Sequence, residues 1–201
     1  MLKHLKTLAV LGFLLSAESS FCASLSVQMQ DQQGKPLADA VVYVEPVNGK
    51  APKGKLAGIV DQVNKEFTPY VSIVQTGTAI TFPNKDNIRH HVYSFSVPKV
   101  FDIKLYSGVP AAPVVFDKPG LVVLGCNIHD WMLAYLYVVD TPWFAKSGSN
   151  GQAEIADLPA GEYVVYAAHP KLQSDILKQK LSVDASSKPK LNFKLTLSAA
   201  Q

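Results

Sequence analysis

The chain has 201 residues, of which 48% are apolar and 17% charged, and its formal net charge is +3 at pH 7. The apolar fraction excludes a disordered chain, and near-average numbers of glycine (12) and proline (13) exclude collagen-like and low-complexity sequences. A chain of this length buries a large core unaided, so its two cysteines do not indicate a disulfide-stapled miniprotein. One or two ordinary domains are expected.

Residues 1–23 have the layout of a secretory signal. Basic residues precede an apolar run over residues 8–15, which is too short to span a bilayer, and small and polar residues follow. We expect cleavage after Cys22 or after Ala23, which removes Cys22 and leaves a periplasmic mature chain without a membrane span. A lipid-modified Cys22 is disfavoured because bulky Phe21 precedes it.

The charge of the mature chain points to no particular partner. Without residues 1–23, 17 basic and 15 acidic residues remain, a net charge of +2. Lys50, Lys53 and Lys55 lie in a stretch rich in glycine, proline and alanine that is typical of a solvated linker. We therefore expect no nucleic-acid partner.

Alternating and β-branched runs predict strands through the rest of the chain. Turn-forming segments such as 33–36, 75–78, 84–87, 149–151 and 159–161 separate them. Residues 170–181 contain some helix formers but equally suit a loop that leads into a strand. The pattern predicts an all-β sandwich or barrel, with strands at residues 26–30, 41–44, 71–74, 79–82, 91–95, 121–124, 133–139, 178–183 and 191–197.

The chemically distinctive segment is residues 125–132. Cys126, His129 and Met132 follow one another at three-residue spacing between two apolar strands. A thiolate and two imidazoles in a trigonal plane, with a weak axial thioether, form the ligand set of blue-copper electron-transfer sites. This loop supplies three of those four ligands.

The second imidazole has two adjacent candidates, His90 and His91. Alternation along a strand sends neighbouring side chains to opposite faces, so only one of them can face the loop. The periodicity does not choose between them.

Residues 56–139 resemble a small cupredoxin of the plastocyanin and amicyanin type. The likeness is carried by Phe67-Thr68-Pro69 and by the stretch from Val74 to Asn84, which is similar to the family's V-x-x-G-x-x-(V/I)-x-(W/F)-x-N segment. The family's first histidine ligand precedes a valine, which implies His90. The resemblance implies a Greek-key β-sandwich and one mononuclear type 1 copper held by His90, Cys126, His129 and Met132, and it extends to cupredoxin-like accessory proteins of methylamine utilisation.

The sequence departs from the family pattern at two positions. His91 replaces the asparagine that ties the two ligand loops together in the family, and Asp130 replaces the proline common after the second histidine. These departures put in question how the outer hydrogen bonds of the site are made.

Each candidate residue also has an ordinary structural interpretation. A buried cysteine, a core methionine or a histidine in a sheet needs no metal, and His4 and His169 are expected to be incidental. Trp131, Trp143 and Phe144 either form an apolar docking patch near His129 or fill an interface between domains.

The two segments that flank the cupredoxin-like part together resemble a single domain. Residues 25–46 and 148–169 are similar to the two parts of a carboxypeptidase regulatory-like (transthyretin-like) β-sandwich. We expect a signal peptide at 1–23, a split sandwich at 24–50 and 140–201, and a cupredoxin domain at 51–139 inserted into it or packed against it. The alternative is a single elaborated cupredoxin with strand extensions.

Three function classes follow. The leading one is a periplasmic type 1 copper protein that passes single electrons between redox partners, and a transient redox protein is then the expected partner. The second is a copper chaperone or maturation accessory without electron transfer. The third is a structural or interaction module that lacks a metal. No nucleophile elbow, carboxylate pair or phosphate-binding loop occurs, so an enzyme is not expected.

Overall fold

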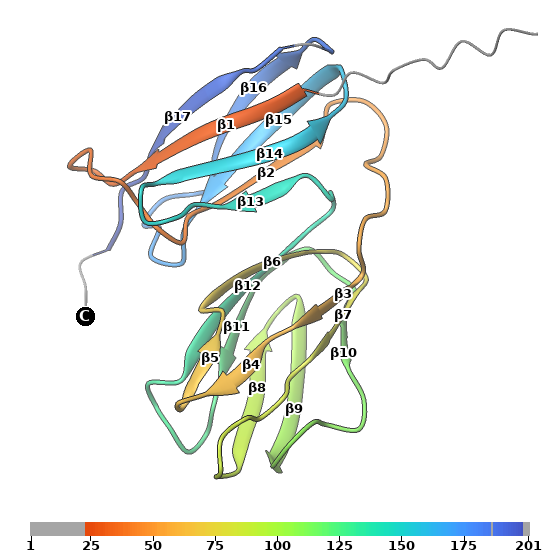
Figure 1. Cartoon of the computed structure of the whole chain (residues 1–201), viewed down its shortest axis with the longest axis vertical. Helices are drawn as coiled ribbons and strands as arrows, with labels where there is room; N and C mark the ends of the chain where they lie inside the picture. The colour runs from red at the N-terminus through yellow and green to blue at the C-terminus, as the bar shows by residue number, and fades with distance from the viewer. Residues whose placement is uncertain (1–22, 186, 199–201) are drawn as a thin grey trace, which may run out of the picture.

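The structure is a computed structural model that describes residues 23–185 and 187–198. These residues form two β-sandwiches stacked end to end, which we call the upper and lower sandwich after their places in Figure 1. The predicted all-β class is confirmed: residues 170–181 carry no helix but lead into strand β16 (Leu177–Val183). Within the described ranges, no helix is long and apolar enough to cross a membrane. The signal segment and Cys22 lie outside those ranges.

The upper sandwich consists of a three-stranded and a four-stranded sheet. Their strand orders are β14-β1-β17 and β13-β2-β15-β16. The apolar faces of both sheets enclose one core that contains Leu25, Met29, Val165 and Phe193. The strands besides β16 are β1 (Ala23–Gln30), β2 (Val41–Pro46), β13 (Phe144–Lys146), β14 (Gln152–Leu158), β15 (Gly161–Ala168) and β17 (Lys190–Lys194).

Strand pairing joins the two ends of the chain in the upper sandwich. β1 pairs with β14 so that Val27 lies opposite Ala153, and β2 pairs with β15 so that Val41 lies opposite Ala168. The segments that resemble two halves of one sandwich therefore share both sheets. The exact division of the chain at residues 50 and 139 stays a prediction.

The lower sandwich packs a five-stranded sheet against a three-stranded one. The orders are β6-β12-β11-β8-β9 and β10-β7-β3, and a small β4-β5 hairpin lies beside them. The core between the sheets includes Phe82, Val92, Phe116 and Leu136. The strands are β3 (Ala57–Ile59), β4 (Asp61–Val63), β5 (Glu66–Thr68), β6 (Val71–Gln75), β7 (Thr78–Thr81), β8 (His90–Ser96), β9 (Lys99–Tyr106), β10 (Val114–Phe116), β11 (Gly120–Gly125) and β12 (Leu133–Val139).

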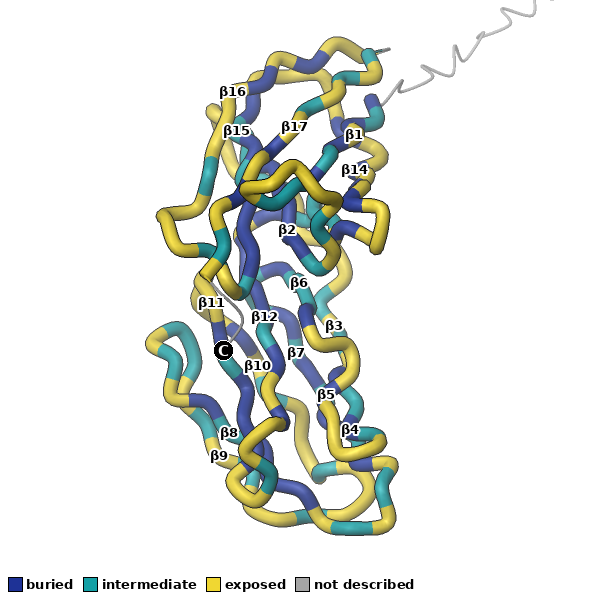
Figure 2. The backbone as a smooth tube through the Cα atoms, turned by 90° about the vertical axis from the view of Figure 1, so that its left-hand side faces the viewer, coloured by how far each residue is buried: buried dark blue, intermediate teal, exposed yellow. Residues whose placement is uncertain are grey.

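A third apolar cluster joins the two sandwiches. Tyr43 and Val41 of the upper sandwich pack with Tyr137, Val139 and Val71 of the lower one. The rings of Tyr43 and Tyr166 are stacked with centroids 4.7 Å apart. Figure 2 shows buried backbone continuing from β2 into β6 and β12 where the sandwiches meet. The contact between the sandwiches is therefore a packed apolar interface.

Hydrogen bonds also attach the linker between β2 and β3 to the lower sandwich. The amide N–H of Gly54 donates to Gln75 Oε1 at 2.6 Å, and Gln75 Nε2 donates to the carbonyl of Pro52 at 2.8 Å. On the returning linker, the Thr76 hydroxyl donates to Asp140 at 2.5 Å. Both chain crossings are thus held near the same end of the lower sandwich.

Trp143 and Phe144 lie in the upper sandwich. Phe144 is part of the interface cluster, and the Trp143 ring packs edge-on against Tyr163 with centroids 5.8 Å apart. Neither ring joins His129, so the docking-patch interpretation of these two residues is wrong. Phe144 fills the interface, as the alternative interpretation expected, and Trp143 packs against the core of the upper sandwich.

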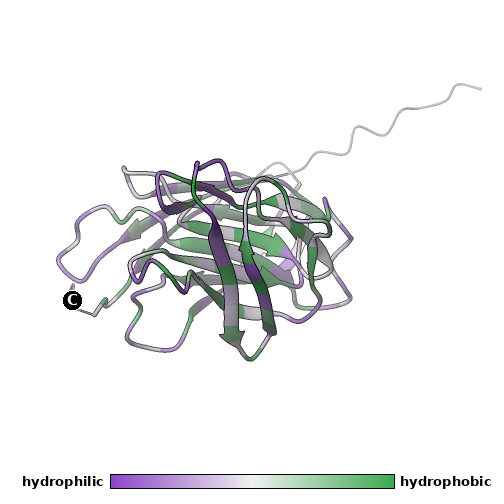
Figure 3. Cartoon of the chain, turned by 90° about the horizontal axis from the view of Figure 1, so that it is seen from below, coloured by the Kyte–Doolittle hydropathy of each residue, from purple (hydrophilic) through white to green (hydrophobic). Residues whose placement is uncertain are grey.

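Apolar residues concentrate in the strands and polar ones in the loops. Figure 3, viewed from below, shows green segments along the strands and purple segments mainly in the connections. Some apolar side chains of the lower sandwich are nevertheless exposed, and Phe95 on β8 is 79% exposed.

Replacing Tyr137 by alanine tests the interface. The ring is buried between the sandwiches, so its removal should destabilise the fold by about 3 kcal/mol. We expect one cooperative thermal transition in the natural chain and two separate transitions in Tyr137→Ala, measured by calorimetry. Phe95→Ala on the same sheet should leave the single transition in place. A single unshifted transition in Tyr137→Ala would contradict this account.

His169 predicts a pH dependence of stability in the upper sandwich. Burial is the main reason that its pKa is lowered from 6.5, and the positive charge of Lys171 acts in the same direction, while Asp39 and a backbone contact to Ala38 oppose them. As pH falls through about 6.5, the unfolded chain binds a proton before the folded one, so stability should decrease from there down to the lowered pKa. Urea unfolding at pH 7.5 and 5.5 should show a smaller pH effect in His169→Gln, and an equal effect would refute this.

Candidate metal centre

Two connections at one end of the lower sandwich bring the candidate ligands together. His90 is the first residue of β8, while Cys126 and His129 lie in the loop between β11 and β12. In Figure 1 this end is the one away from the upper sandwich. β12 runs from the loop to the interface, and its seven residues span about 20 Å at roughly 3.3 Å per residue.

A glycine permits the close pairing of β8 and β11 beside the loop. Gly125, immediately before Cys126, lies opposite Tyr93. A Cβ atom at this position would lie 2.8 Å from the Tyr93 ring, closer than real contacts allow. The absence of a side chain therefore lets Cys126 lie next to the start of β8.

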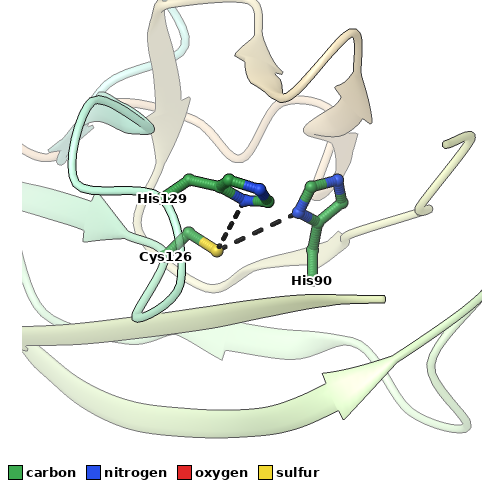
Figure 4. A group of neighbouring side chains, drawn as sticks. All are labelled: His90, Cys126 and His129. Atoms are coloured by element: carbon green, nitrogen blue, oxygen red, sulfur yellow. Dashed lines mark hydrogen bonds between the residues drawn. The ribbon is translucent and has the colours of Figure 1, made fainter. Parts of the chain in front are cut away.

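The three donor atoms face one another. Cys126 Sγ lies 4.0 Å from His90 Nδ1 and 3.8 Å from His129 Nδ1, the two contacts that are dashed in Figure 4. All three donor atoms lie within 4.8 Å of one another, and the two imidazole rings are tilted by 57° with centroids 4.9 Å apart. Cys126 is buried and has no disulfide partner.

These separations suit a single metal ion. Metal–sulfur and metal–nitrogen bonds of about 2.3 and 2.05 Å place sulfur and nitrogen about 3.8 Å apart at a trigonal angle, and about 3.6 Å apart at a tetrahedral one. The observed 3.8 and 4.0 Å are closer to the trigonal value. The residues present therefore fit a metal ion bound by one sulfur and two nitrogens.

Met132 lies in the same core cluster as Cys126 and is 1% exposed. Its amide N–H donates to the carbonyl of His129 at 3.0 Å, which tightens the loop into a turn. The sequence-predicted methionine is thus buried in the core that also contains Cys126, and it carries the fourth donor type. The set His90, Cys126, His129 and Met132 resembles a type 1 copper site.

The structure separates the two adjacent histidines. His90 is fully buried and faces Cys126, whereas the His91 ring contacts Tyr93, with centroids 5.5 Å apart, and bonds the carboxylate of Asp102. Alternation along β8 places His90 and the core residue Val92 on the inner face and His91 on the opposite face of the sheet. Geometry therefore brings His90 and not His91 to the cluster.

The outer nitrogen of His90 bonds a carboxylate. Asp86 Oδ2 lies 2.7 Å from His90 Nε2. Partial burial disfavours the charged carboxylate, but bonds from Lys65, His90 and Asn64 outweigh this and lower the pKa of Asp86. A charged carboxylate only accepts, so Nε2 is the donor of this bond, and Nδ1 is the ring nitrogen that faces the sulfur.

His129 is half-buried and its pKa is lowered from 6.5. Burial is the main cause, and the nearby His90 and Lys65 add to it while Asp86 opposes it. The neutral imidazole that a metal requires is therefore the favoured form at neutral pH. Two apolar side chains flank it: Ile128 is 47% exposed and Trp131 is 65% exposed, with the Trp131 ring 5.2 Å from the His129 ring.

Sequence reasoning missed Asp86 and Lys65. Asp86 precedes His90 by four residues in a turn, where the Asn84 side chain accepts from the Asp86 amide at 3.0 Å. An Asn-x-Asp turn shortly before a candidate ligand is the signal that could have indicated it. Asp130, expected beside the second imidazole, is exposed at the rim of the loop.

Comparisons with known proteins return copper proteins. No protein-family model and no curated protein matches the chain. Among solved structures, the copper-containing nitrite reductase of Thermus scotoductus SA-01 is 27% identical over 47% of this chain and 25% of its own, with a TM-score of 0.38. A purple cupredoxin from Nitrosopumilus maritimus is 24% identical over 41% of this chain and 98% of its own, with a TM-score of 0.35. An amicyanin variant in its reduced Cu(I) form is 17% identical over 48% and 97%, with a TM-score of 0.38.

The chain thus spans only a quarter of the nitrite reductase, but nearly the whole of the two small copper proteins. In each case the likeness covers about half of this chain.

Replacing each histidine separately tests the assignment of the first ligand. His90→Ala removes one of the three converging donor atoms and should abolish stoichiometric high-affinity copper binding, whereas His91→Ala should retain it. Copper content after gel filtration, with circular dichroism to verify folding, measures both variants. Retention of copper by His90→Ala would overturn the assignment.

Proposed function

We propose that this chain is a type 1 copper protein that carries single electrons between redox partners. The observation that carries the proposal is the convergence of two imidazole Nδ1 atoms on one buried thiol at near-trigonal separations. Copper bound there would supply a one-electron change between Cu(II) and Cu(I). His90, Cys126 and His129 would hold it through their converging donor atoms, and Met132 would supply the thioether.

The protein's own contribution is to keep these four donors in place. His90 is held by β8, Cys126 directly follows β11, and Met132 is anchored in the core immediately before β12. A rigid ligand set that changes little between the two oxidation states lowers the structural cost of gaining or losing an electron. No catalytic residue is part of the proposal, so we assign a carrier and not an enzyme.

The partner we propose is a transient redox protein that docks around His129. The imidazole is half-exposed at the end of the molecule, and the apolar Ile128 and Trp131 flank it. Small, partly apolar surfaces of this kind suit brief encounters. The upper sandwich lies at the opposite end of β12 and leaves this surface open.

The upper sandwich is proposed to be a carboxypeptidase regulatory-like domain split by the copper-binding part. The pairing of β2 with β15 and of β1 with β14 across the chain supports this. A periplasmic location is proposed from the signal-like layout of residues 1–23. Ala23 is 2% exposed and pairs with Leu158, which favours cleavage after Cys22 over cleavage after Ala23.

Cys126→Ser tests the proposed function directly. Mature protein loaded with Cu(II) should show an intense visible thiolate-to-copper band, and Cys126→Ser should lose it because the sulfur donor is gone. Absorption and circular dichroism spectra measure colour and fold. A colourless stoichiometric Cu(I) complex of the natural chain, with no Cu(II) band, would instead support a copper chaperone or accessory protein.

Met132→Leu tests the axial role. The substitution keeps an apolar side chain of similar volume but removes the thioether, so the colour should persist and the reduction potential should rise. Met29→Leu, in the core of the upper sandwich, is the matched control and should leave the potential unchanged. Equal potentials in both variants and the natural chain would exclude an axial Met132.

A further inference from the structure

One carboxylate at the site accepts hydrogen bonds from three groups. Asp86 Oδ1 accepts from the Asn64 amide at 2.7 Å, and Asp86 Oδ2 accepts from the Lys65 amide at 2.9 Å and from His90 Nε2 at 2.7 Å. Asn64 and Lys65 belong to the turn between β4 and β5, which is far from His90 in sequence. Asp86 therefore joins a candidate ligand to a separate hairpin.

That turn has an unusual backbone. Asn64 and Lys65 have φ values of 56° and 58°, so both adopt the left-handed conformation of a two-residue hairpin turn. Left-handed backbone is costly for a residue such as lysine. The Asp86 carboxylate accepts both amides of the turn and so stabilises it in this conformation.

The ligand loop bonds the same turn from the other side. The indole Nε1–H of Trp131 donates to the carbonyl of Lys65 at 3.2 Å, and the Trp131 ring lies 5.2 Å from that of His129. Lys65 thus donates to Asp86 through its amide and accepts from Trp131 through its carbonyl. A single residue links the His90 side of the site to the His129 side.

The connection through Lys65 replaces a different connection between the ligand loops in the family pattern. In the cupredoxins that the chain resembles, an asparagine after the first histidine ties the ligand loops, and here that position is His91, which bonds Asp102 on the outer face. Asn84 supports the connection through Asp86. Its side-chain amide donates to the carbonyls of Ile88 and Tyr106 at 2.8 and 2.9 Å and so fixes the segment that carries Asp86.

We propose that Asp86, Asn64, Lys65 and Trp131 form a brace that sets the orientation of His90 relative to the loop from Cys126 to Met132. Asp86 and Trp131 are positioning residues: Asp86 bonds the His90 ring and Trp131 packs against the His129 ring, so each acts through a candidate ligand. The proposal rests on the proposed copper site and deepens it. In this proposal the β4-β5 hairpin holds the start of β8 and the loop from Cys126 to Met132 at a fixed separation.

Asp86→Asn is the first test. Asparagine keeps the shape and one acceptor oxygen, but it has no charge, and its NH2 group must face either the Asn64 donor or the Lys65 and His90 donors. Loss of an outer partner of a metal ligand typically weakens affinity 10- to 100-fold, and we expect a loss in this range by competition with a chelator. The visible and electron paramagnetic resonance spectra should change as His90 reorients.

The matched control is Asp102→Asn. It removes the same kind of carboxylate from the neighbouring His91, whose ring lies outside the cluster. Copper affinity and both spectra should equal those of the natural chain. An equal effect of Asp102→Asn and Asp86→Asn would mean that general charge loss, not the brace, causes the change.

Trp131→Phe tests the second connection. Phenylalanine keeps an apolar ring but lacks the indole donor, so copper affinity should fall about fivefold, the usual value of one hydrogen bond. Because both connections pass through Lys65, the double variant should lose less than the product of the single effects. Strictly multiplicative effects would overturn the shared brace.

A metal-free measurement separates this proposal from the proposed function. In the apo protein, nitrogen NMR should find the His90 hydrogen on Nε2, and Asp86→Asn should shift this tautomer and speed hydrogen exchange at the Lys65 amide. If the natural chain gives no thiolate-to-copper band, the proposed function fails. If the band forms but Asp86→Asn changes neither affinity, spectra nor the apo signals, the brace alone fails.

Discussion

The sulfur of Cys126 has to lie beside two imidazole nitrogens in a region without bulk water, and the lower sandwich is organised around this requirement. The candidate ligands come from the start of β8 and from the loop that follows β11, and these two strands are neighbours in one sheet, so backbone pairing between β8 and β11 sets their separation. Gly125 allows that pairing to be close because a side chain there would strike Tyr93. Each of these three side chains alone would be an ordinary residue of the fold. Together they form a cluster of polar groups, and the free-energy cost of burying that cluster is lowest when a metal ion binds it.

The motif in the loop was predictable because its geometry is local. Cys126, His129 and Met132 are close in sequence. The short loop that contains them joins two paired strands, so the three residues must lie near one another. The choice between His90 and His91 was not local. Strand alternation shows that they face opposite ways, but which one faces inward depends on which face of β8 packs on the core, and tertiary contacts set that: His90 shares the inner face with Val92. Family resemblance implied His90, and the geometry agrees.

The fold could be predicted where burial leaves a clear alternation. β12 and β11 carry apolar residues in runs and were expected within one residue of their observed bounds. β3, β4 and β5 have three residues each, too few to show a period, and they were missed. β9 is an edge strand with alternating charges, so its pattern resembled a loop. The role of Asp86 was not predicted for a related reason: its partners belong to the β4-β5 hairpin, which the sequence pattern did not indicate.

The way the chain crosses twice between the sandwiches also affects how the upper one can assemble. Its strands β2 and β13 are separated by about one hundred residues, and closing a free loop of that length is entropically unfavourable. The contacts of Gln75 with Gly54 and Pro52, and of Thr76 with Asp140, hold both crossings near one end of the lower sandwich. Once the lower sandwich is folded, the loop to be closed shrinks to the two linkers, about 15 residues, which lowers the closure cost by ~1.7 kcal/mol. The folded lower sandwich thus brings the separated ends of the upper one together.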